Sequence, residues 1–504
     1  MPTFTRRHFL RSAGGLTLLA ASPLRRSLLA AGAMEPAPPV FTAMPYIQPG
    51  PEGKLLPGAE TVRLAWQTGT TDADFAVAFG RTGRFDRKGA ISRATRTYMG
   101  KWEVDGIINY VCVLSGLELG TEYNYRVTCG SRPIAEGYFT TRQPRGRMIR
   151  FAAFGDNSFG EPGERAVAFH AYRAHPDFIM NVGDNVYESG LDNEYTRHFF
   201  PVYNADSASP DVGAPLLRSI PFYSVIANHD VAAKDPYTRH PCADFDADPD
   251  SLGYYTNFYF PLNGPRAPSF QTPTRGGDAL ADFVACAGDR FPQMANYSYD
   301  YGDAHFICMD SNIYVDPTDP ALAKWIEADM SATDARWKFA VFHHPPFNVG
   351  ANHYHEQHMR ALCPLFERLG VDFVLGGHEH NYQRTVPLTF VPDNLSRAKT
   401  RNTTNRLTPG KITLDTEFDG VTRTKPKGVI YIVTGAGGKH LYDEEYTGNP
   451  KRWLLAEDKL TPYATQMVAD RHSFTLFDLD RDSVVLRQID QFGAEIDRIT
   501  VTKV

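Results

Sequence analysis

Five short polar stretches constrain the fold of this chain more than any other feature of its sequence. Each follows a run of apolar residues whose length and composition predict a buried strand. Because the carboxyl ends of parallel strands meet at one edge of a sheet, where ligands gather, we expect the five stretches to form a single site. They occupy residues 155–157, 183–187, 228–230, 343–345 and 377–380.

The apolar runs alternate with helical patterns, which predicts an α/β fold whose sheet is covered on both faces. The domain that carries the site is expected to span residues 146–504, and strands within 428–504 should complete the second half of a sheet sandwich. The earlier strands are expected at residues 148–154, 177–182, 221–227, 305–309, 338–342 and 372–375, and the helices at 164–174, 320–332 and 356–369.

Two long insertions interrupt this domain, at residues 236–290 and 387–427. Both are polar and rich in Pro, Gly and Asp, so we expect irregular loops. Long loops of this kind usually form the rims of functional sites. We therefore expect them to contribute the walls of the pocket.

Residues 34–145 predict a separate all-β domain, because alternating strands are separated by turn-forming residues. Residues 117–127 resemble the late strand of a fibronectin type III domain, in which a tyrosine bonds back to the backbone. The resemblance implies a structural role for Tyr123 and Tyr125. The expected strands cover residues 61–68, 109–114 and 123–128.

The first 33 residues predict an export signal. Arg6 and Arg7 lie in a twin-arginine pattern, an apolar run follows at residues 13–21, and residues 31–33 are small enough for a cleavage site. We therefore expect residues 1–33 to be a twin-arginine signal peptide and the mature protein to be periplasmic or extracellular. No other stretch approaches the roughly 20 apolar residues that a membrane span needs, so we expect no stable span.

The rest of the chain is acidic. Five of the 52 basic residues lie in the first 33 residues, so the remainder carries 47 basic against 58 acidic residues, a net charge of −11. Such a surface has no general attraction to nucleic acid or anionic lipid. We therefore expect no nucleic-acid partner, and any affinity for phosphate must be local to the site.

Six cysteines are few for 504 residues. In an oxidising compartment some of them could pair, and the sequence leaves two pairs open. Cys308 and Cys363 lie in apolar segments and are expected to be buried thiols. The two open pairs are Cys112 with Cys129 and Cys242 with Cys286.

The residue types in the five stretches predict a site for two metal ions. Seven of the 16 histidines lie between residues 343 and 380. A two-metal site needs one carboxylate that bridges ions ~3.5–4 Å apart and terminal ligands from several strands. Asp184 suits the bridge, Asp156 suits a terminal position, and Asn228 offers a neutral oxygen. Nitrogen ligands are expected from His343, His378 and His380.

In order and spacing, the five stretches resemble the motifs of the calcineurin-like metallophosphoesterases, and among these the purple acid phosphatases. The resemblance runs from about residue 147 to residue 384, and GHEHNYQR at residues 377–384 is close to the last motif of the family. It implies a metallophosphoesterase β-sandwich flanked by helices and preceded by an all-β, fibronectin III-like sandwich. Ala227 departs from the pattern, because the family has glycine there.

The same resemblance assigns the metals. Tyr187 stands three residues after Asp184, where purple acid phosphatases place a tyrosinate, and a phenolate favours a hard trivalent ion. The resemblance therefore implies Fe(III) held by Asp156, Asp184, Tyr187 and His380. It implies a second, divalent ion (zinc, iron or manganese) held by Asp184, Asn228, His343 and His378.

The resemblance also implies residues that act on the substrate. The family uses the histidine at His229 to contact the phosphate, and His353 stands where plant-type members carry a histidine that protonates the leaving group. Asn352 replaces a second histidine of those members, and His355 is an alternative proton donor nearby. Asp230 is expected to orient a neighbouring histidine.

These residues predict an exported, acid phosphatase-like hydrolase of phosphate monoesters, in which a metal-bound hydroxide attacks a small phosphate ester. A phosphodiesterase or a nucleotide-hydrolysing enzyme is an alternative, because the insertions shape the pocket. A non-catalytic exported binding protein is a second alternative, which is disfavoured because all seven ligand residues are present. The all-β domain is also a candidate for homodimer formation.

Overall fold

The structure is a computed structural model, and it describes residues 41–98, 106–231, 242–266, 268–396, 398–399, 406–453 and 462–503. The expected signal peptide lies outside the described residues. The chain from Pro38 to Val504 forms one compact unit. In the described ranges, no helix is both long enough and apolar enough to cross a membrane.

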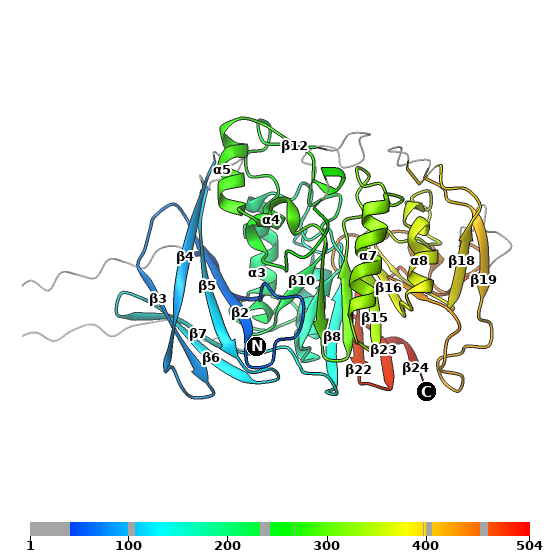
Figure 1. Cartoon of the computed structure of the whole chain (residues 1–504), viewed down its shortest axis with the longest axis horizontal. Helices are drawn as coiled ribbons and strands as arrows, with labels where there is room; N and C mark the ends of the chain where they lie inside the picture. Colours follow the sequence, from blue (N-terminus) through cyan, green and yellow to red (C-terminus); the bar gives the residue numbers. More distant parts are fainter. Residues whose placement is uncertain are drawn as a thin grey trace, which may run out of the picture. The chain divides into compact units, whose positions relative to one another are not determined.

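The described chain begins with an all-β domain in which every pairing is antiparallel (Figure 1). Its apolar side chains alternate inward along the strands, and Trp66 stacks on Tyr110 in the core with ring centroids 5.5 Å apart. In sheet order the strands are β1 (Phe41–Pro49), β2 (Glu60–Thr68), β5 (Gly106–Leu117), β4 (Arg87–Thr97), β3 (Phe75–Arg81), β6 (Glu122–Cys129) and β7 (Arg132–Thr140).

The two tyrosines of β6 are structural, as the resemblance implied. The backbone N–H of Glu118 donates to the hydroxyl oxygen of Tyr123 at 3.1 Å, which ties the β5–β6 corner together. The hydroxyl of Tyr125 donates to the backbone oxygen of Arg218 at 2.9 Å, and Arg218 belongs to the following domain. One tyrosine therefore fixes a turn and the other fixes a domain contact.

Buried ion pairs join the all-β domain to the rest of the unit. Arg96 on β4 is fully buried and pairs with Asp192 of the following domain. Arg142 pairs with Glu60 at 2.6 Å and also donates to the backbone oxygen of Asp300 at 3.1 Å. Because removing one partner of a buried pair leaves the other charge uncompensated, these contacts hold the two domains in a fixed relation.

Two packed sheets form the core of the second domain, which confirms the predicted sandwich. Phe151 and Phe477 stack at 4.5 Å in the first sheet, and both meet Phe339 of the second sheet edge-on at 5.5 and 5.6 Å. In order, the first sheet contains β10 (Phe222–Ser224), β9 (Phe178–Asn181), β8 (Ile149–Phe154), β22 (Ser473–Leu479), β23 (Ser483–Asp490) and β24 (Glu495–Thr502). The second contains β13 (Tyr297–Tyr301), β14 (Ala304–Cys308), β15 (Trp337–Val341), β16 (Phe373–Gly376), β20 (Ile430–Thr434), β17 (Tyr382–Thr385) and β21 (Ala464–Val468).

Helices flank the sandwich. The predicted helix at residues 320–332 is present as α7 (Pro320–Ala332), which begins where the side chain of Asp319 accepts from the N–H of Ala321 and where Pro320 occupies the first turn. The others are α1 (Pro162–Arg173), α2 (Asp192–Glu194), α3 (Phe200–Tyr203), α4 (Gly253–Asn257), α5 (Asp278–Ala287), α6 (Arg290–Gln293) and α8 (Cys363–Arg368), with single turns η1 (Tyr195–Phe199), η2 (Leu216–Arg218), η3 (Pro268–Phe270), η4 (His358–Leu362) and η6 (Glu444–Tyr446).

The helix predicted at residues 356–369 is wrong in its first half. Residues 358–362 form the 3-10 turn η4, and the α-helix begins only at Cys363. Pro364 explains the break, because proline lacks the N–H that an uninterrupted helix would need and its ring clashes with the preceding turn. Glu356 therefore lies in a loop, which matters for the site described below.

The prediction of irregular insertions is also wrong in part. The first insertion contains α4, α5 and the short pair β11 (Ala243–Asp244) and β12 (Thr274–Arg275). The second contains an antiparallel pair, β18 (Leu388–Pro392) and β19 (Gly410–Leu414). Phe283 on α5 packs against the guanidinium of Arg96, whose carbon lies 5.0 Å from the ring centroid, so the first insertion covers the domain junction.

All six cysteines lie within the described residues, and all are free. Cys112 on β5 and Cys129 on β6 are on strands that are not neighbours in the sheet. The sulfur of Cys286 accepts instead from the side-chain amide of Asn109 at 3.3 Å. Neither of the two open disulfides is therefore formed, whereas Cys308 and Cys363 are buried as predicted.

Candidate metal centre

The five polar stretches come together where the two sheets present the carboxyl ends of their strands. Asp156 follows β8 and Asp184 follows β9, and these two strands are parallel neighbours in the first sheet. His343 follows β15 and His378 follows β16, which are parallel neighbours in the second. Each sheet thus delivers one pair of side chains to a shared edge, as the sequence predicted.

Three of these residues have a left-handed backbone that residues other than glycine rarely adopt. The φ angle is 55° at Asp156, 50° at Asp184 and 70° at His378. The backbone N–H of His378 lies 3.1 and 3.0 Å from the two carboxylate oxygens of Asp156, so one strained turn supports the other. Strain of about 1–3 kcal/mol per residue persists only where the surroundings impose it, and it concentrates at functional sites.

The hydroxyl oxygen of Tyr187 is the meeting point of one group of side chains. It lies 3.2 Å from an oxygen of Asp156, 3.2 Å from an oxygen of Asp184 and 3.2 Å from Nε2 of His380. A phenol carries one hydrogen and can donate it to only one of the three. The four residues expected to hold the trivalent ion therefore converge on one point with more acceptors than donors.

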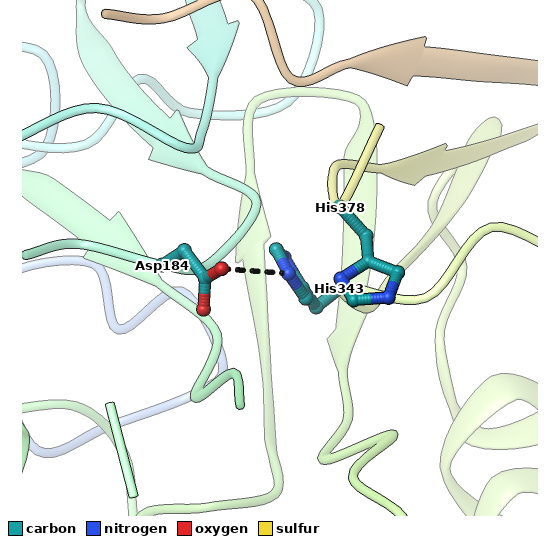
Figure 2. A group of neighbouring side chains, drawn as sticks. All are labelled: Asp184, His343 and His378. Atoms are coloured by element: carbon teal, nitrogen blue, oxygen red, sulfur yellow. Dashed lines mark ion pairs between the residues drawn. The ribbon is translucent and has the colours of Figure 1, made fainter. Parts of the chain in front are cut away.

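A second group lies beside it. Asp184, His343 and His378 are buried and face one another, with one donor atom of each within 4.8 Å of the other two (Figure 2). Nε2 of His343 lies 3.2 Å from Oδ2 of Asp184. Both amide atoms of Asn228 are buried and have no hydrogen-bond partner among the described residues. Because buried polar atoms are nearly always satisfied, this unpartnered amide indicates a ligand position.

The ring orientations of two histidines are fixed by backbone carbonyls. Nδ1 of His343 lies 2.9 Å from the oxygen of Val182, and Nδ1 of His380 lies 2.7 Å from the oxygen of His440. A carbonyl can only accept, so each neutral ring keeps its proton on Nδ1 and turns the lone pair of Nε2 toward Asp184 or Tyr187. This arrangement is typical of histidines that bind metal ions.

Electrostatics within the group are unbalanced. Burial, together with the neighbouring charge of Asp184, raises the pKa of Asp156 to about 8 against the lowering effect of His343. Burial would also raise the pKa of Asp184, but His343 and His229 outweigh it and lower that pKa. Burial would lower the pKa of His343, yet the two carboxylates raise it to about 9. The two buried carboxylates are therefore stabilised in their charged form only by positive charge placed beside them.

The comparisons with known proteins agree with this geometry. The model of the calcineurin-like phosphoesterase family matches residues 149–382, which carry all seven predicted ligands. Those residues form a calcineurin-like phosphoesterase domain. Purple acid phosphatase 17 of Arabidopsis thaliana is 25% identical to the chain over 250 residues. The match covers 48% of this chain and 65% of that relative, so the chain spans less than two thirds of the relative's length.

Solved structures share the fold of the phosphoesterase domain and of the strands around it. The purple acid phosphatase PPD1 from yellow lupin (Lupinus luteus) seeds superposes with a TM-score of 0.64 at 17% identity, and covers 91% of this chain and 74% of its own. A structure of PhoD superposes with a TM-score of 0.53 at 12% identity, covering 93% of this chain and 94% of its own. At these identities the likeness concerns the fold alone, and the chain has the fold of a purple acid phosphatase-like metallophosphoesterase.

The phosphoesterase domain implies metal ions, and the residues present fit them. Within the described residues, the amide of Asn228 has no hydrogen-bond partner, and Nε2 of His343 has an ion pair with Asp184 but no well-aligned hydrogen bond. Together with the crowded oxygen of Tyr187, these are the atoms that bound metal ions would satisfy. Carboxylate, phenol and amide oxygens with imidazole nitrogens suit iron, zinc or manganese. The structure thus brings all seven predicted ligands together, while their roles as ligands stay predictions.

The two residues that follow Asn228, His229 and Asp230, make different contacts. His229 stays at the centre: its N–H donates to an oxygen of Asp184 at 2.9 Å, and its Nδ1 lies 2.7 Å from the backbone oxygen of Glu188. Asp230 was expected to orient a histidine. Its carboxylate instead accepts from the backbone N–H groups of Asn185 and Ala227, at 3.2 and 3.0 Å, so it fixes the two ligand loops against each other.

The loop after β15 carries the remaining predicted residues. His353 packs on His378 with ring centroids 3.8 Å apart, and its backbone N–H donates to the carboxylate of Glu379 at 2.8 Å. His353 therefore lies at the centre, as expected for a proton donor. Asn352 and His355 are exposed on the same loop, and the choice of His353 over His355 as proton donor stays a prediction.

Sequence reasoning missed the loop at residues 435–442, which closes the centre of the phosphoesterase domain. Its Lys439 N–H donates to the backbone oxygen of Asp156 at 2.8 Å, and Tyr442 stacks on His380 at 4.0 Å. A side chain on Gly435 would lie 2.2 Å from the backbone of Glu379, so glycine is required there. The available signal was the pattern Gly-Ala-Gly-Gly directly after a buried strand, at residues 435–438.

Proposed function

We propose that the protein is an exported phosphatase with a dinuclear metal centre that hydrolyses small phosphate monoesters. The observation that carries this proposal is the convergence of Asp156, Asp184 and His380 on the oxygen of Tyr187. A tyrosine in that position is what separates the purple acid phosphatases from other members of the superfamily. The matched relatives support the same class of reaction.

In this proposal Fe(III) is held by Asp156, Asp184, Tyr187 and His380. A divalent ion, zinc, iron or manganese, is held by Asp184, Asn228, His343 and His378. When bound, such ions polarise phosphoryl oxygens and supply a strong nucleophile from water at neutral pH.

The residues of the chain supply binding and proton transfer. His229 is held beside Asp184 by its own backbone N–H, where its ring can meet a phosphate oxygen. Burial would lower the pKa of His353, but its hydrogen bond to Glu356 at 3.1 Å and the charges of Glu379, Glu356 and Asp156 together outweigh burial and raise that pKa. A protonated His353 can give its proton to a departing alkoxide, which is the step where an alkyl ester needs help.

Export and partners are part of the same proposal. The twin-arginine pattern of residues 1–33 supports a periplasmic or extracellular location, and the net charge of −11 for the rest of the chain argues against nucleic acid as a partner. The substrate is then a small phosphate ester that reaches the centre from solution. Homodimer formation through the all-β domain is tested by the molecular mass in solution.

The decisive measurement is the metal content and visible spectrum of the purified mature protein. We expect two metal ions per chain, including iron, and a purple tyrosinate-to-Fe(III) band that is lost in Tyr187→Phe. Two zinc or manganese ions in a colourless protein would keep a metallophosphoesterase and overturn the Fe(III) assignment. Rates on nitrophenyl phosphate and on bis-nitrophenyl phosphate, measured on the same sample, separate a monoesterase from a phosphodiesterase.

A further inference from the structure

Glu356 lies at the centre of three histidines, although the sequence offered no reason to single it out. It is 6% exposed and lies in the loop between His353 and η4. One of its oxygens, Oε1, lies 3.1 Å from Nδ1 of His353 and 3.2 Å from Nε2 of His378. The other, Oε2, lies 3.8 Å from Nε2 of His344, which is too long for a hydrogen bond.

The contact with His378 determines which of its ring nitrogens faces the centre. A carboxylate can only accept, so the neutral ring carries its proton on Nε2 and keeps the lone pair on Nδ1. His343 and His380 have the opposite arrangement, with Nδ1 on a backbone carbonyl. Among the three predicted imidazole ligands in the described chain, His378 is thus the one whose ring proton a side chain accepts, so a mutation can remove that acceptor.

The contact with His353 involves the same oxygen atom. The carboxylate oxygen accepts from Nδ1 at 3.1 Å and so fixes the orientation of that ring. The rings of His353 and His378 are 3.8 Å apart, which places the expected proton donor directly against an expected ligand. One carboxylate therefore touches the residues for both tasks.

The position of Glu356 is itself well defined. Its backbone N–H donates to the oxygen of His353 at 3.0 Å. The side chain of the next residue, Gln357, accepts from the N–H of Thr408 at 3.1 Å, and Arg360 donates to the backbone oxygen of Pro346 at 2.6 Å. The second insertion thus braces this loop from outside, and Glu356 is held rather than free to turn away.

We propose that Glu356 is a positioning residue that sets the tautomer of His378 and the orientation of His353. Its removal should therefore weaken divalent-metal binding and leaving-group protonation together. The part concerning His353 rests on the proposed phosphatase function. The part concerning His378 requires only that the centre binds a metal ion, so the two parts can fail separately.

The test uses full-length mature protein and the variants Glu356→Ala and Glu356→Gln. The matched control is Glu367→Gln, which removes the charge of a half-buried carboxylate on α8 that accepts from the N–H of Phe390 at 2.6 Å. Zn²⁺ affinity is measured by titrating metal-free protein against a chelating dye, and folding is checked by thermal unfolding. Values of kcat and KM are measured for an alkyl phosphate and for nitrophenyl phosphate.

We expect Glu356→Ala to weaken Zn²⁺ binding about 10–100-fold, the usual cost of losing a residue that orients a metal ligand. It should also lower kcat for the alkyl ester about tenfold more than kcat for the nitrophenyl ester, whose leaving group needs little protonation. Glu356→Gln keeps an oxygen acceptor at the same place, so it should restore most of the Zn²⁺ affinity and most of the alkyl-ester rate. The control should match the wild-type protein.

Wild-type Zn²⁺ affinity in a folded Glu356→Ala protein would overturn the role at His378. Equal Zn²⁺ losses in the Ala and Gln variants would overturn the tautomer argument, because the amide oxygen still accepts. If Glu356→Ala does not fold, Glu356→Met takes its place, because it keeps the volume without an acceptor, and unchanged alkyl and nitrophenyl rates in that variant overturn the role at His353. A wild-type protein without hydrolytic activity would remove the proposed function, while the Zn²⁺ comparison would still decide the role at His378.

Discussion

Two clusters in this molecule each bury a histidine between carboxylates, and they differ in whether the hydrogen bonds are complete. At the centre, Nε2 of His343 lies 3.2 Å from Asp184 and 3.8 Å from Asp156, and within the described residues it has these ion pairs but no well-aligned hydrogen bond. On β14, His305 places Nδ1 2.7 Å from Asp300 and Nε2 2.8 Å from Asp329. Both rings are on or after strands of the same sheet.

The cluster at His305 is completed by its neighbours. The hydroxyl of Ser298 donates to Asp329 at 2.6 Å, and Arg145 pairs with Asp300 at 2.9 Å. The cluster lines a cavity of about 470 Å³ beside the domain junction. Its polar atoms already have partners, so a ligand would find no open donor or acceptor among them. This cluster is a structural ion pair.

The difference shows that burial, histidine and carboxylate together do not identify a metal site. The centre is distinguished by donors without partners, by an amide at Asn228 that nothing satisfies, and by strained ligand turns at Asp156 and Asp184. The cluster at His305 has none of these features within the described residues. The predictions below test whether the two clusters differ in function as they do in geometry.

The largest effect is expected for Asp184→Asn, which removes the residue shared by both groups of ligands. Metal retention should fall from two ions to fewer than one, and hydrolysis should fall by about 10³-fold or more, since the ions supply several kcal/mol of transition-state stabilisation. Elemental analysis and nitrophenyl phosphate turnover measure the two losses. A metal-loaded and active Asp184→Asn protein would contradict the bridging assignment.

A smaller effect is expected for His353→Ala. Turnover of an alkyl phosphate should fall by about 10²-fold, as is usual when a general acid is lost, while turnover of nitrophenyl phosphate should fall much less. Metal content should be unchanged. Steady-state rates on the two esters give the ratio directly, and equal losses would count against a role for His353 in proton transfer.

His305→Gln should act on stability and not on chemistry. Removing the ring leaves Asp300 and Asp329 facing each other at a largely buried site, which should cost about 3 kcal/mol in the free energy of unfolding. Metal content and turnover of the folded protein should match the wild type. Denaturant unfolding measures the loss, and a drop in metal content at full folding would show that the two clusters are coupled.

The pH dependence of that loss should be the smallest and most specific effect. Burial would lower the pKa of His305, but hydrogen bonds to Asp300 and Asp329 and the charges of these carboxylates outweigh it, so the pKa is raised. Burial would raise the pKa of Asp300, but the hydrogen bond and charge of His305 and the charge of Arg145 together outweigh it, with a hydrogen bond from Thr333, and that pKa is lowered. The raised histidine stabilises the fold fully below about pH 6.5 and loses that effect as pH rises through its folded pKa. The lowered carboxyl stabilises the fold above about pH 4 and loses that effect at lower pH.

The unfolding free energies of the wild type and His305→Gln should therefore differ most between about pH 4 and pH 6.5. Above that window the difference should shrink by about 1.4 kcal/mol for each unit by which the pKa of His305 is raised. Comparing the two proteins at pH 5 and pH 9 cancels the titration of the metal centre, which both contain. A difference that is the same at both values would show that His305 is not charged in the fold.

Most of the fold could be predicted from periodicity, because strands buried on both faces read as continuous apolar runs. The helix at residues 320–332 was predicted to the residue, since Asp319 and Pro320 give a local start signal. The helix at Glu356 failed because Pro364 interrupts it, and α5 was missed because its surroundings read as polar loop. The first failure overlooked a local proline signal, and the second lies where tertiary packing outweighs local pattern.

The ligands of the centre could be predicted because each follows a strand, and strand ends converge by topology. The residues that orient them could not. The carbonyl of His440 carries no side-chain signal, and Glu356 gains its role only when the loop folds back on His378. Asp230 was misassigned for the same reason, since its partners Asn185 and Ala227 are set by how two loops meet.

The loop at residues 435–442 also has a consequence for the order in which the protein is assembled. A ribosome that has just added His380 has supplied every predicted ligand, yet the carbonyl that orients His380 and the Lys439 N–H that braces Asp156 are still to be made. Strand β22, which pairs with β8 beneath Asp156, comes later still. A nascent chain at that stage contains the predicted ligands but lacks the residues that orient them. Firm metal binding is therefore expected only after the whole polypeptide has been made.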